Sequence, residues 1–198
     1  MVAMLERAIA SSEAPAILET ILLPETELAI WRRPVAPALV AAISATDLGR
    51  IDDLDQPFAI EGLDSALHAA LGAAGHETTR APLTVELTAL ARRFARVMDC
   101  EHLRIRVNVV ETDACRKFHK DFVTARLLLT LAGPATQWID GRDGDAAEIR
   151  SLAAGDVALV KGRRWSPEGS ILHRSPPILG TGVRRLVVAI DPVEHETA

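Results

Sequence analysis

The sequence predicts an α+β fold, with helices in the first half of the chain and an antiparallel β sandwich or barrel in the second. The chain has 198 residues, of which 48% are hydrophobic and 25% charged, and this is enough to bury a sizeable core. Near Cys100 the spacing of apolar residues changes from the helical period to the period of two that is typical of half-buried strands. These two observations together indicate one globular unit with two kinds of secondary structure.

The first hundred residues are rich in alanine and leucine, and their apolar positions recur at helical spacing. One short apolar segment that ends at Pro34 is typical of a strand, and one acidic segment is typical of a turn. We therefore expect helices over residues 2–10, 36–45, 63–74 and 84–99, a strand over 27–34 and a turn over 52–57.

After Cys100, short β-rich segments follow one another, each bounded by Gly, Pro or Asp. Such spacing is typical of antiparallel sandwiches and barrels rather than of βαβ units. Residues 1–100 would then form a mainly helical extension on a β core of residues 101–198, together one structural domain. We expect strands over residues 102–111, 123–133, 136–140, 156–162, 170–173 and 183–191, with a hairpin loop over 140–148.

Charge and composition narrow the range of partners. The net charge of -5 gives no electrostatic reason to expect nucleic acid, whose binders usually carry a basic face. The two cysteines, Cys100 and Cys115, form no CxxC pair, which favours a reducing compartment. The N-terminus lacks the pattern of a signal peptide, and every apolar run is far shorter than the roughly 20 residues that span a bilayer. We expect a cytoplasmic protein without membrane or nucleic-acid partners.

A candidate metal site combines three residues. His119 and Asp121 are one residue apart in "FHKDF", and on a strand such residues point to the same face. His173, 54 residues later, is the candidate third ligand. Two histidines and a carboxylate form a facial triad that leaves positions open on a metal such as Fe(II). An HxD triplet alone is a weak signal, because this composition produces about 0.4 of them by chance.

A pair of arginines is a candidate anion site. Arg184 and Arg185 lie in an apolar segment that is typical of a buried strand, where neighbours point to opposite faces. One guanidinium would face the core, where it could bind a carboxylate of a ligand or of an internal acidic residue. Arg126 and Thr130 lie at even spacing on the strand expected after the HxD triplet, and they are further candidates for lining the pocket.

The order of HxD, a later histidine and then arginine resembles the motif of Fe(II)- and 2-oxoglutarate-dependent dioxygenases. The resemblance implies a double-stranded β-helix (jelly-roll, cupin-like) core with the N-terminal helices packed on one sheet. It implies Fe(II) bound by His119, Asp121 and His173, and 2-oxoglutarate held by a basic residue on a late strand. In "GVRRL", the GxR pattern of prolyl-hydroxylase-type enzymes matches Arg184 better than its neighbour.

A second resemblance covers most of the chain. The segments "CRKFHKDFVTARLLLTLAGPATQW", "GDVALVKG", "HRSPP" and "RRLVVAID" are similar to the signature of domain-of-unknown-function family 1826, a bacterial family, and "LAIWRR" is similar to its opening. This resemblance implies a family and leaves the chemistry open.

Two alternatives to an oxygenase remain open at the level of sequence. One is a cupin-like protein that binds zinc or nickel and is hydrolytic or metal-handling, since three protein ligands plus water also suit zinc. The other is a metal-free β-sandwich binding protein in which His119 and Asp121 are structural. The substrate could be a small molecule or a peptide, and no motif specifies which. No motif specifies the oligomeric state.

Overall fold

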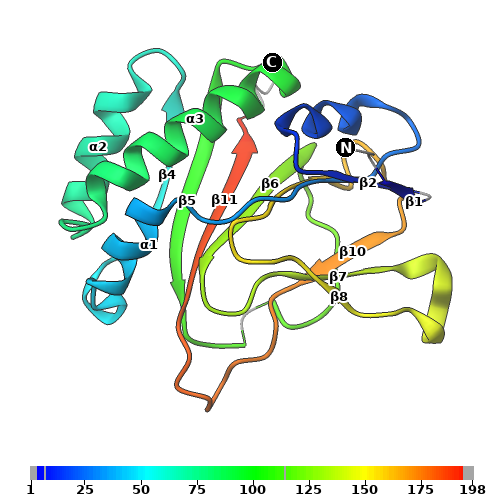
Figure 1. The fold of residues 1–198 in the computed structure, drawn as a ribbon. Helices are drawn as coiled ribbons and strands as arrows, with labels where there is room; N and C mark the ends of the chain where they lie inside the picture. The colour runs from blue at the N-terminus through cyan, green and yellow to red at the C-terminus, as the bar shows by residue number, and fades with distance from the viewer. Residues whose placement is uncertain (1–3, 7, 114, 194–198) are drawn as a thin grey trace.

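A computed structural model describes residues 4–6, 8–113 and 115–193 as two β-sheets and a layer of helices (Figure 1). The large sheet has eight strands in the order β1-β2-β3-β9-β6-β11-β5-β4, and the small sheet has the order β10-β7-β8. In chain order the strands are β1 (Met4–Glu6), β2 (Ile9–Ser12), β3 (Leu28–Trp31), β4 (Leu54–Ala59), β5 (His102–Val110), β6 (Ala125–Ala132), β7 (Gln137–Asp140), β8 (Arg150–Ser151), β9 (Val157–Lys161), β10 (Ile171–Arg174) and β11 (Arg185–Pro192). The helices are α1 (Pro37–Ser44), α2 (Leu63–Ala73) and α3 (Arg80–Met98), with 3₁₀ helices η1 (Pro15–Leu22), η2 (Leu48–Arg50) and η3 (Gly141–Ala146).

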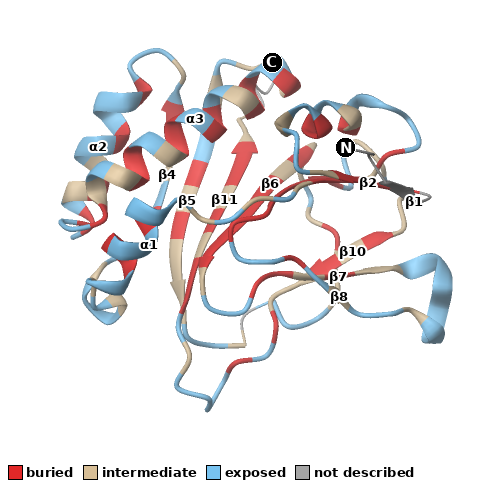
Figure 2. Cartoon of the chain, in the orientation of Figure 1, coloured by how far each residue is buried: buried red, intermediate tan, exposed pale blue. Residues whose placement is uncertain are grey.

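One face of the large sheet packs beneath the helices, and the other packs on the small sheet at β2, β3, β9 and β6, so these strands contribute to two cores (Figure 2). On β6, Leu127 and Leu129 belong to the core beneath the helices, whereas Leu128 belongs to the core shared with the small sheet. This alternation follows from the strand period of two. A polar residue on β6 that is separated from Leu128 by an even number of positions therefore points into the space between the two sheets.

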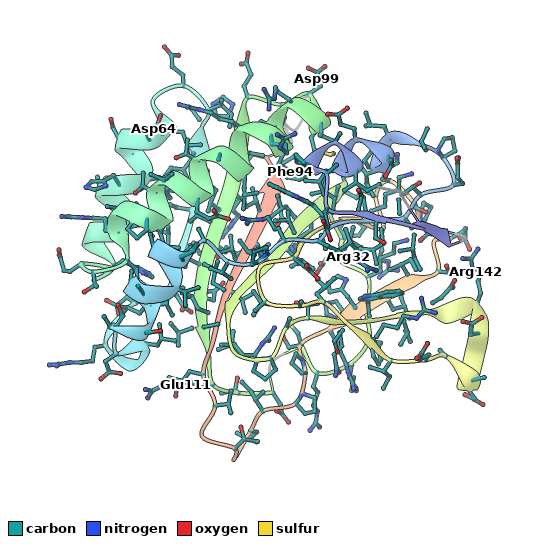
Figure 3. The ribbon with its side chains drawn as sticks, viewed as in Figure 1. Arg32, Asp64, Phe94, Asp99, Glu111 and Arg142 are labelled. Atoms are coloured by element: carbon teal, nitrogen blue, oxygen red, sulfur yellow. The ribbon has the colours of Figure 1, made fainter. Side chains whose placement is uncertain are left out.

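The longest helix, α3, attaches the helical layer to the large sheet. Its side chains at Leu83, Leu87, Leu90 and Phe94 are each at most 3% exposed, at the spacing of one helical face (Figure 3). Burying a side chain of this size contributes roughly 1.5–3 kcal/mol. The helix ends at Asp99, whose φ of 50° is the left-handed conformation common after a helical C-terminus.

Several predicted elements are confirmed. The helices expected over 36–45, 63–74 and 84–99 are α1, α2 and α3. The strand expected over 27–34 is β3, and those expected from residue 102 onward are β5, β6, β7, β9, β10 and β11. The loop over 140–148 contains η3 and leads from β7 to β8.

The helix expected over residues 2–10 is wrong where the structure describes it. Met4–Glu6 and Ile9–Ser12 are strands, while residues 2, 3 and 7 lie outside the described part. β2 pairs in parallel with β3, and Ala8, Ile9 and Ala10 are all buried. A strand buried on both faces has a continuous apolar run, which periodicity alone does not separate from a helix.

The acidic turn expected over 52–57 is also wrong, because β4 begins at Leu54. β4 is the edge strand of the large sheet, where Pro57 can lie without removing an inner hydrogen bond. Its Leu54 and Phe58 point to the core beneath the helices, and its Asp55 pairs with Arg104 on β5. With β1 to β4 in the large sheet, the first hundred residues contribute strands as well as helices, which differs from the expected division at residue 100.

No helix within the described residues combines the length and apolar character needed to cross a membrane.

Candidate metal centre

The three predicted metal ligands meet between the two sheets. His119 and Asp121 lie in the connection between β5 and β6, which is a loop and not the strand that their spacing suggested. A single antiparallel bridge fixes this loop to β10, because the backbone N–H groups of His119 and His173 each donate to the other residue's carbonyl, at 3.0 and 2.9 Å. The bridge brings the histidine rings to a centroid distance of 4.8 Å.

The side chains converge on the Asp121 carboxylate. Asp121 Oδ2 lies 3.0 Å from His173 Nε2, and Asp121 Oδ1 lies 3.6 Å from His119 Nε2. One nitrogen or oxygen atom from each of the three residues falls within 4.8 Å of the others. Asp121 and His173 are mostly buried, while the His119 side chain is 34% exposed. The cluster is therefore open to solvent on the His119 side.

The polar atoms of this cluster are incompletely satisfied. Asp121 Oδ2 is buried and has no hydrogen-bond partner within the described chain, because its close contact with His173 lacks hydrogen-bond alignment. His119 Nδ1 lies 2.9 Å from the Lys117 carbonyl, and this leaves Nε2 directed to the cluster. A buried carboxylate oxygen and two imidazole nitrogens that face it are the donor set of a metal site.

Electrostatics keep the carboxylate ionised. Burial by itself would raise the pKa of Asp121, but the facing His119 and His173 rings and the Arg126 guanidinium outweigh it and hold the pKa well below its usual range. The contact with Asp121 raises the pKa of His119 despite partial burial. The carboxylate therefore favours the protonated form of His119.

Arg126 connects this carboxylate to the large sheet. Its Nη1 lies 2.6 Å from Asp121 Oδ1, and its Nε and Nη2 donate to Asp191 at 2.7 and 2.9 Å. Asp191 is the next-to-last residue of β11 and also accepts a hydrogen bond from Arg106 on β5. Arg126 thus occupies one oxygen of Asp121 and leaves the other free. Asp191 was not predicted, although its even spacing from an inward-facing arginine on the same strand is a signal for it.

The two candidate anion-binding arginines, Arg184 and Arg185, point to opposite sides, as neighbours on a strand do. Arg184 is exposed and pairs with Glu111, at the lower end of β5 in Figure 3, and with Asp47. Arg185 is 1% exposed and faces the space between the sheets. The arginine that matches the GxR pattern, Arg184, is therefore the exposed one, and Arg185 is the one that faces the space between the sheets.

The Arg185 guanidinium is buried without an acidic partner among the described residues. Its Nε donates to the Pro134 carbonyl at 2.6 Å and its Nη1 to Ser175 Oγ at 2.9 Å, while Nη2 has no partner. Burial lowers the pKa of Arg185. Because Ser175 is two residues after His173, the arginine lies beside the strand that carries the third candidate ligand. A buried cation of this kind is costly unless an anion joins it.

Thr130 is on the same face of β6 as Arg126 and is 2% exposed. Its Oγ1 is buried and, like Arg185 Nη2, has no partner in the described part of the chain. Thr130 pairs in register with Val187, two residues along β11 from Arg185. Thr130 Oγ1 and Arg185 Nη2, both unsatisfied, therefore lie on neighbouring strands and on the same face of the large sheet.

Comparison with solved structures gives remote matches. The crystal structure of dioxygenase for auxin oxidation from rice matches with a TM-score of 0.51 and 13% identity, over 82% of this chain and 71% of that one. A prolyl-4-hydroxylase from Pseudomonas putida has a TM-score of 0.49 and 14% identity, over 91% of this chain and 98% of that one. At these identities the likeness of the rice structure concerns the fold alone.

Comparison with curated proteins finds no match to this sequence. The family comparison confirms the second of the two resemblances. The family model described as "Protein of unknown function (DUF1826)" matches residues 12–191, and the chain therefore belongs to this family.

Proposed function

We propose that this protein is an oxygenase that uses Fe(II) and 2-oxoglutarate and is built on a double-stranded β-helix. The observation that carries the proposal is a pair of complementary unsatisfied groups between the two sheets. Within the described residues, Asp121 Oδ2 is a buried carboxylate oxygen that has only the close contact with His173 Nε2 and no hydrogen bond, and Arg185 Nη2 is a buried guanidinium nitrogen without a hydrogen-bond partner. The first requires a cation and the second an anion.

The residues present fit Fe(II). The cluster offers two imidazole nitrogens and one carboxylate, from His119, His173 and Asp121. These ligand atoms are close enough to bind one ion. This set leaves coordination positions open, as in non-haem iron oxygenases. Arg126 would hold Asp121 Oδ1, so that Oδ2 is the oxygen directed to the metal.

The residues present also fit a dicarboxylate such as 2-oxoglutarate. Arg185 would bind its distal carboxylate through Nη2, with Nε and Nη1 already fixed by Pro134 and Ser175. A guanidinium fixed in this way loses little conformational freedom on binding. The unsatisfied Thr130 Oγ1 would supply a second donor.

Fe(II) bound there would couple decarboxylation of 2-oxoglutarate to hydroxylation of a substrate, with O₂ as the oxidant. The protein's own contributions are to hold the ligands, to keep Asp121 ionised, and to exclude water on the side of the buried His173. The rice structure, which is named as a dioxygenase, supports the fold assignment. The exposed edge of His119 would be the entry side for the substrate.

Anaerobic titration with Fe(II) and then 2-oxoglutarate tests the proposal. We expect a visible metal-to-ligand charge-transfer band, which is lost in His119→Ala and Asp121→Ala. Tight metal binding with no band would favour the zinc or nickel alternative. Metal binding that is unchanged in both variants would show that His119 and Asp121 do not hold the metal, and a sharp loss of stability in the metal-free variants would indicate that these residues are structural.

A further inference from the structure

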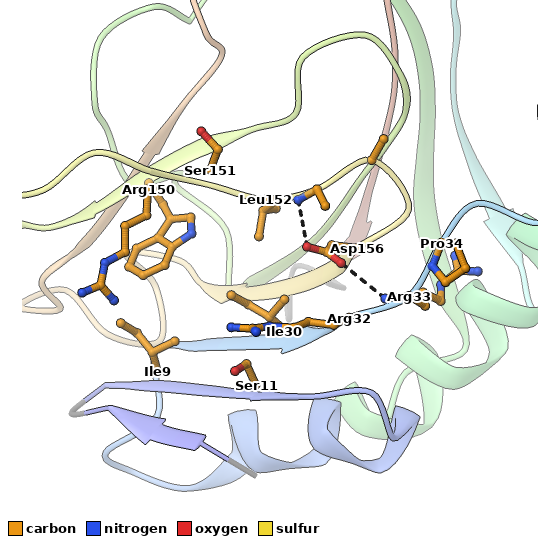
Figure 4. A pocket seen from close by; sticks show the side chains of 13 residues that line it. Ile9, Ser11, Ile30, Arg32, Arg33, Pro34, Arg150, Ser151, Leu152 and Asp156 are labelled. Atoms are coloured by element: carbon orange, nitrogen blue, oxygen red, sulfur yellow. Dashed lines mark hydrogen bonds between the residues drawn. The ribbon is translucent and has the colours of Figure 1, made fainter. Parts of the chain in front are cut away.

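A cavity of about 610 Å³ opens between β2 and β3 of the large sheet and β8 of the small sheet (Figure 4). This volume is in the range of pockets that take small organic ligands. The triad residues do not line it. Trp138 does line it, and Trp138 stands opposite His173 in the β7–β10 register, so the cavity and the triad are neighbours along the small sheet.

The floor of the cavity is apolar. It is formed by buried side chains of the core between the two sheets, namely Ile9, Ile30, Trp138 and Leu152. Their burial keeps the floor fixed, because these side chains also pack on one another. An apolar, preformed floor favours a ligand with a flat hydrophobic body.

The charge on the wall is positive. Arg33 contributes little to it, since its guanidinium pairs with Glu86 on α3. The cavity's one carboxylate, Asp156, already accepts the backbone N–H groups of Arg33 and Ala153, at 3.3 and 2.8 Å. The remaining charges belong to Arg32 and Arg150.

Arg32 is the arginine of the cavity wall whose charge is not neutralised by an acidic side chain among the described residues. It follows Ile30 by two residues, so its side chain leaves β3 on the cavity face, and Figure 4 shows it lying across the cavity. It has no ion-pair partner among the residues that the structure describes. On the opposite sheet, Arg150 lies over the Trp138 ring at 5.3 Å and pairs with Glu148, which is 75% exposed. The Arg150 side chain is itself 41% exposed and has five N–H donors, so a ligand anion can approach it beside its present contacts.

We infer that this cavity binds a small organic anion, with a carboxylate- or sulfonate-type group between Arg32 and Arg150 and a planar apolar body on Trp138 and Ile30. The charge complementarity is local, since the chain as a whole carries a net charge of -5. The inference stands apart from the proposed oxygenase function, because none of its residues is a candidate ligand of the metal or of 2-oxoglutarate.

Fluorescence titration of the metal-free full-length protein with anilinonaphthalene sulfonate tests the inference, beside the uncharged probe N-phenylnaphthylamine. We expect saturable binding at one site, at least about tenfold tighter for the sulfonate, as one charge-assisted contact provides. Arg32→Gln and Arg150→Gln should each weaken sulfonate binding by about tenfold and leave the uncharged probe unaffected. Arg104→Gln, on β5 next to the opposite edge strand of the large sheet, is the matched control and should bind as the wild type does.

Equal affinity for the two probes, or sulfonate binding that survives both cavity substitutions, would overturn the inference. Sulfonate binding that is lost in Arg185→Met and kept in Arg32→Gln and Arg150→Gln would overturn it as well, because the probe would then occupy the Arg185 site. Circular dichroism of each variant establishes that the fold is intact. The expected probe results do not depend on whether the protein binds 2-oxoglutarate. Failure of the proposed oxygenase function can therefore be distinguished from failure of this inference.

Discussion

Lys120 Nζ donates to Glu27 Oε2 at 3.0 Å, and this ion pair is buried, with side-chain exposures of 4% and 13%. Lys120 lies between His119 and Asp121 in the chain. Glu27 also accepts the backbone N–H groups of Ser170 and Ile171, at 3.1 and 3.3 Å, where β10 begins. One carboxylate thus joins the loop that carries two candidate metal ligands to the strand that carries the third.

Glu27→Gln should weaken metal binding as well as the fold. The substitution keeps the shape of the side chain but leaves Lys120 buried without a counter-charge, which costs about 3 kcal/mol or more. Loss of a group that orients metal ligands typically lowers metal affinity about 10- to 100-fold. Co(II) titration and urea unfolding measure the two effects.

The matched control is Glu25→Gln, which changes an exposed residue two positions away. It should behave as the wild type in both measurements. A Glu27→Gln protein that loses stability but binds Co(II) with unchanged affinity would show that the ion pair supports the fold only.

The stability difference between wild type and Glu27→Gln should depend on pH. Burial alone would raise the pKa of Glu27, but the Ser170 N–H, the Lys120 ammonium and the Ile171 N–H outweigh it and lower the pKa below its ordinary value of 4.5. A lowered pKa means that the stabilisation is complete above about pH 4.5 and is lost as the pH falls through the folded-state value. Urea unfolding of both proteins between about pH 7 and pH 3 should show a constant difference that shrinks at the acidic end. A difference that stays constant to the lowest pH would contradict this assignment.

The sequence predicted the elements whose pattern is local. The stripe of α3 and the alternation of β5 are each complete within one segment, so periodicity was sufficient for them. β2 could not be predicted in this way, because its apolar run is explained only by its pairing with β3 and by burial on both faces.

The candidate site shows the same limit. The convergence of His119, Asp121 and His173 in the structure follows the hypothesis made from their order, although a bridge in a loop produces it rather than a regular strand. A shift of one residue in the strand register exchanges the directions of the Arg184 and Arg185 side chains. The sequence does not show this register, because the pairing of β11 with β6 is irregular between Leu186 and Val187. Glu27 is 93 residues from Lys120, and no local pattern reports a contact at that distance.

Arg126→Gln should reduce metal affinity by about tenfold, because Asp121 Oδ1 loses the charged partner that orients its carboxylate. Arg106→Gln is the matched control, since Arg106 shares Asp191 with Arg126 but has no contact with Asp121 in the described structure. Both variants remove one arginine from the Asp191 carboxylate, and they should lose similar stability in urea. Only Arg126→Gln should also alter the visible spectrum of bound Co(II), which reports the arrangement of its ligands. Equal metal affinity and identical spectra in the two variants would show that the network is structural.

Arg185→Met should separate ligand binding from stability. The wild-type guanidinium is buried with Nη2 unpaired, so replacing it by an apolar side chain removes a buried charge at the loss of two hydrogen bonds. These effects oppose each other, and the metal-free variant should unfold within about 1 kcal/mol of wild type. 2-Oxoglutarate at 100 times its Kd should stabilise the Fe(II)-loaded wild type by about 2.7 kcal/mol under anaerobic conditions, and Arg185→Met by far less. Arg184→Met should retain the full stabilisation, because Arg184 faces solvent beside Glu111. If Arg184→Met loses the effect and Arg185→Met keeps it, the distal carboxylate is bound on the other face of the strand and the assignment made here is wrong.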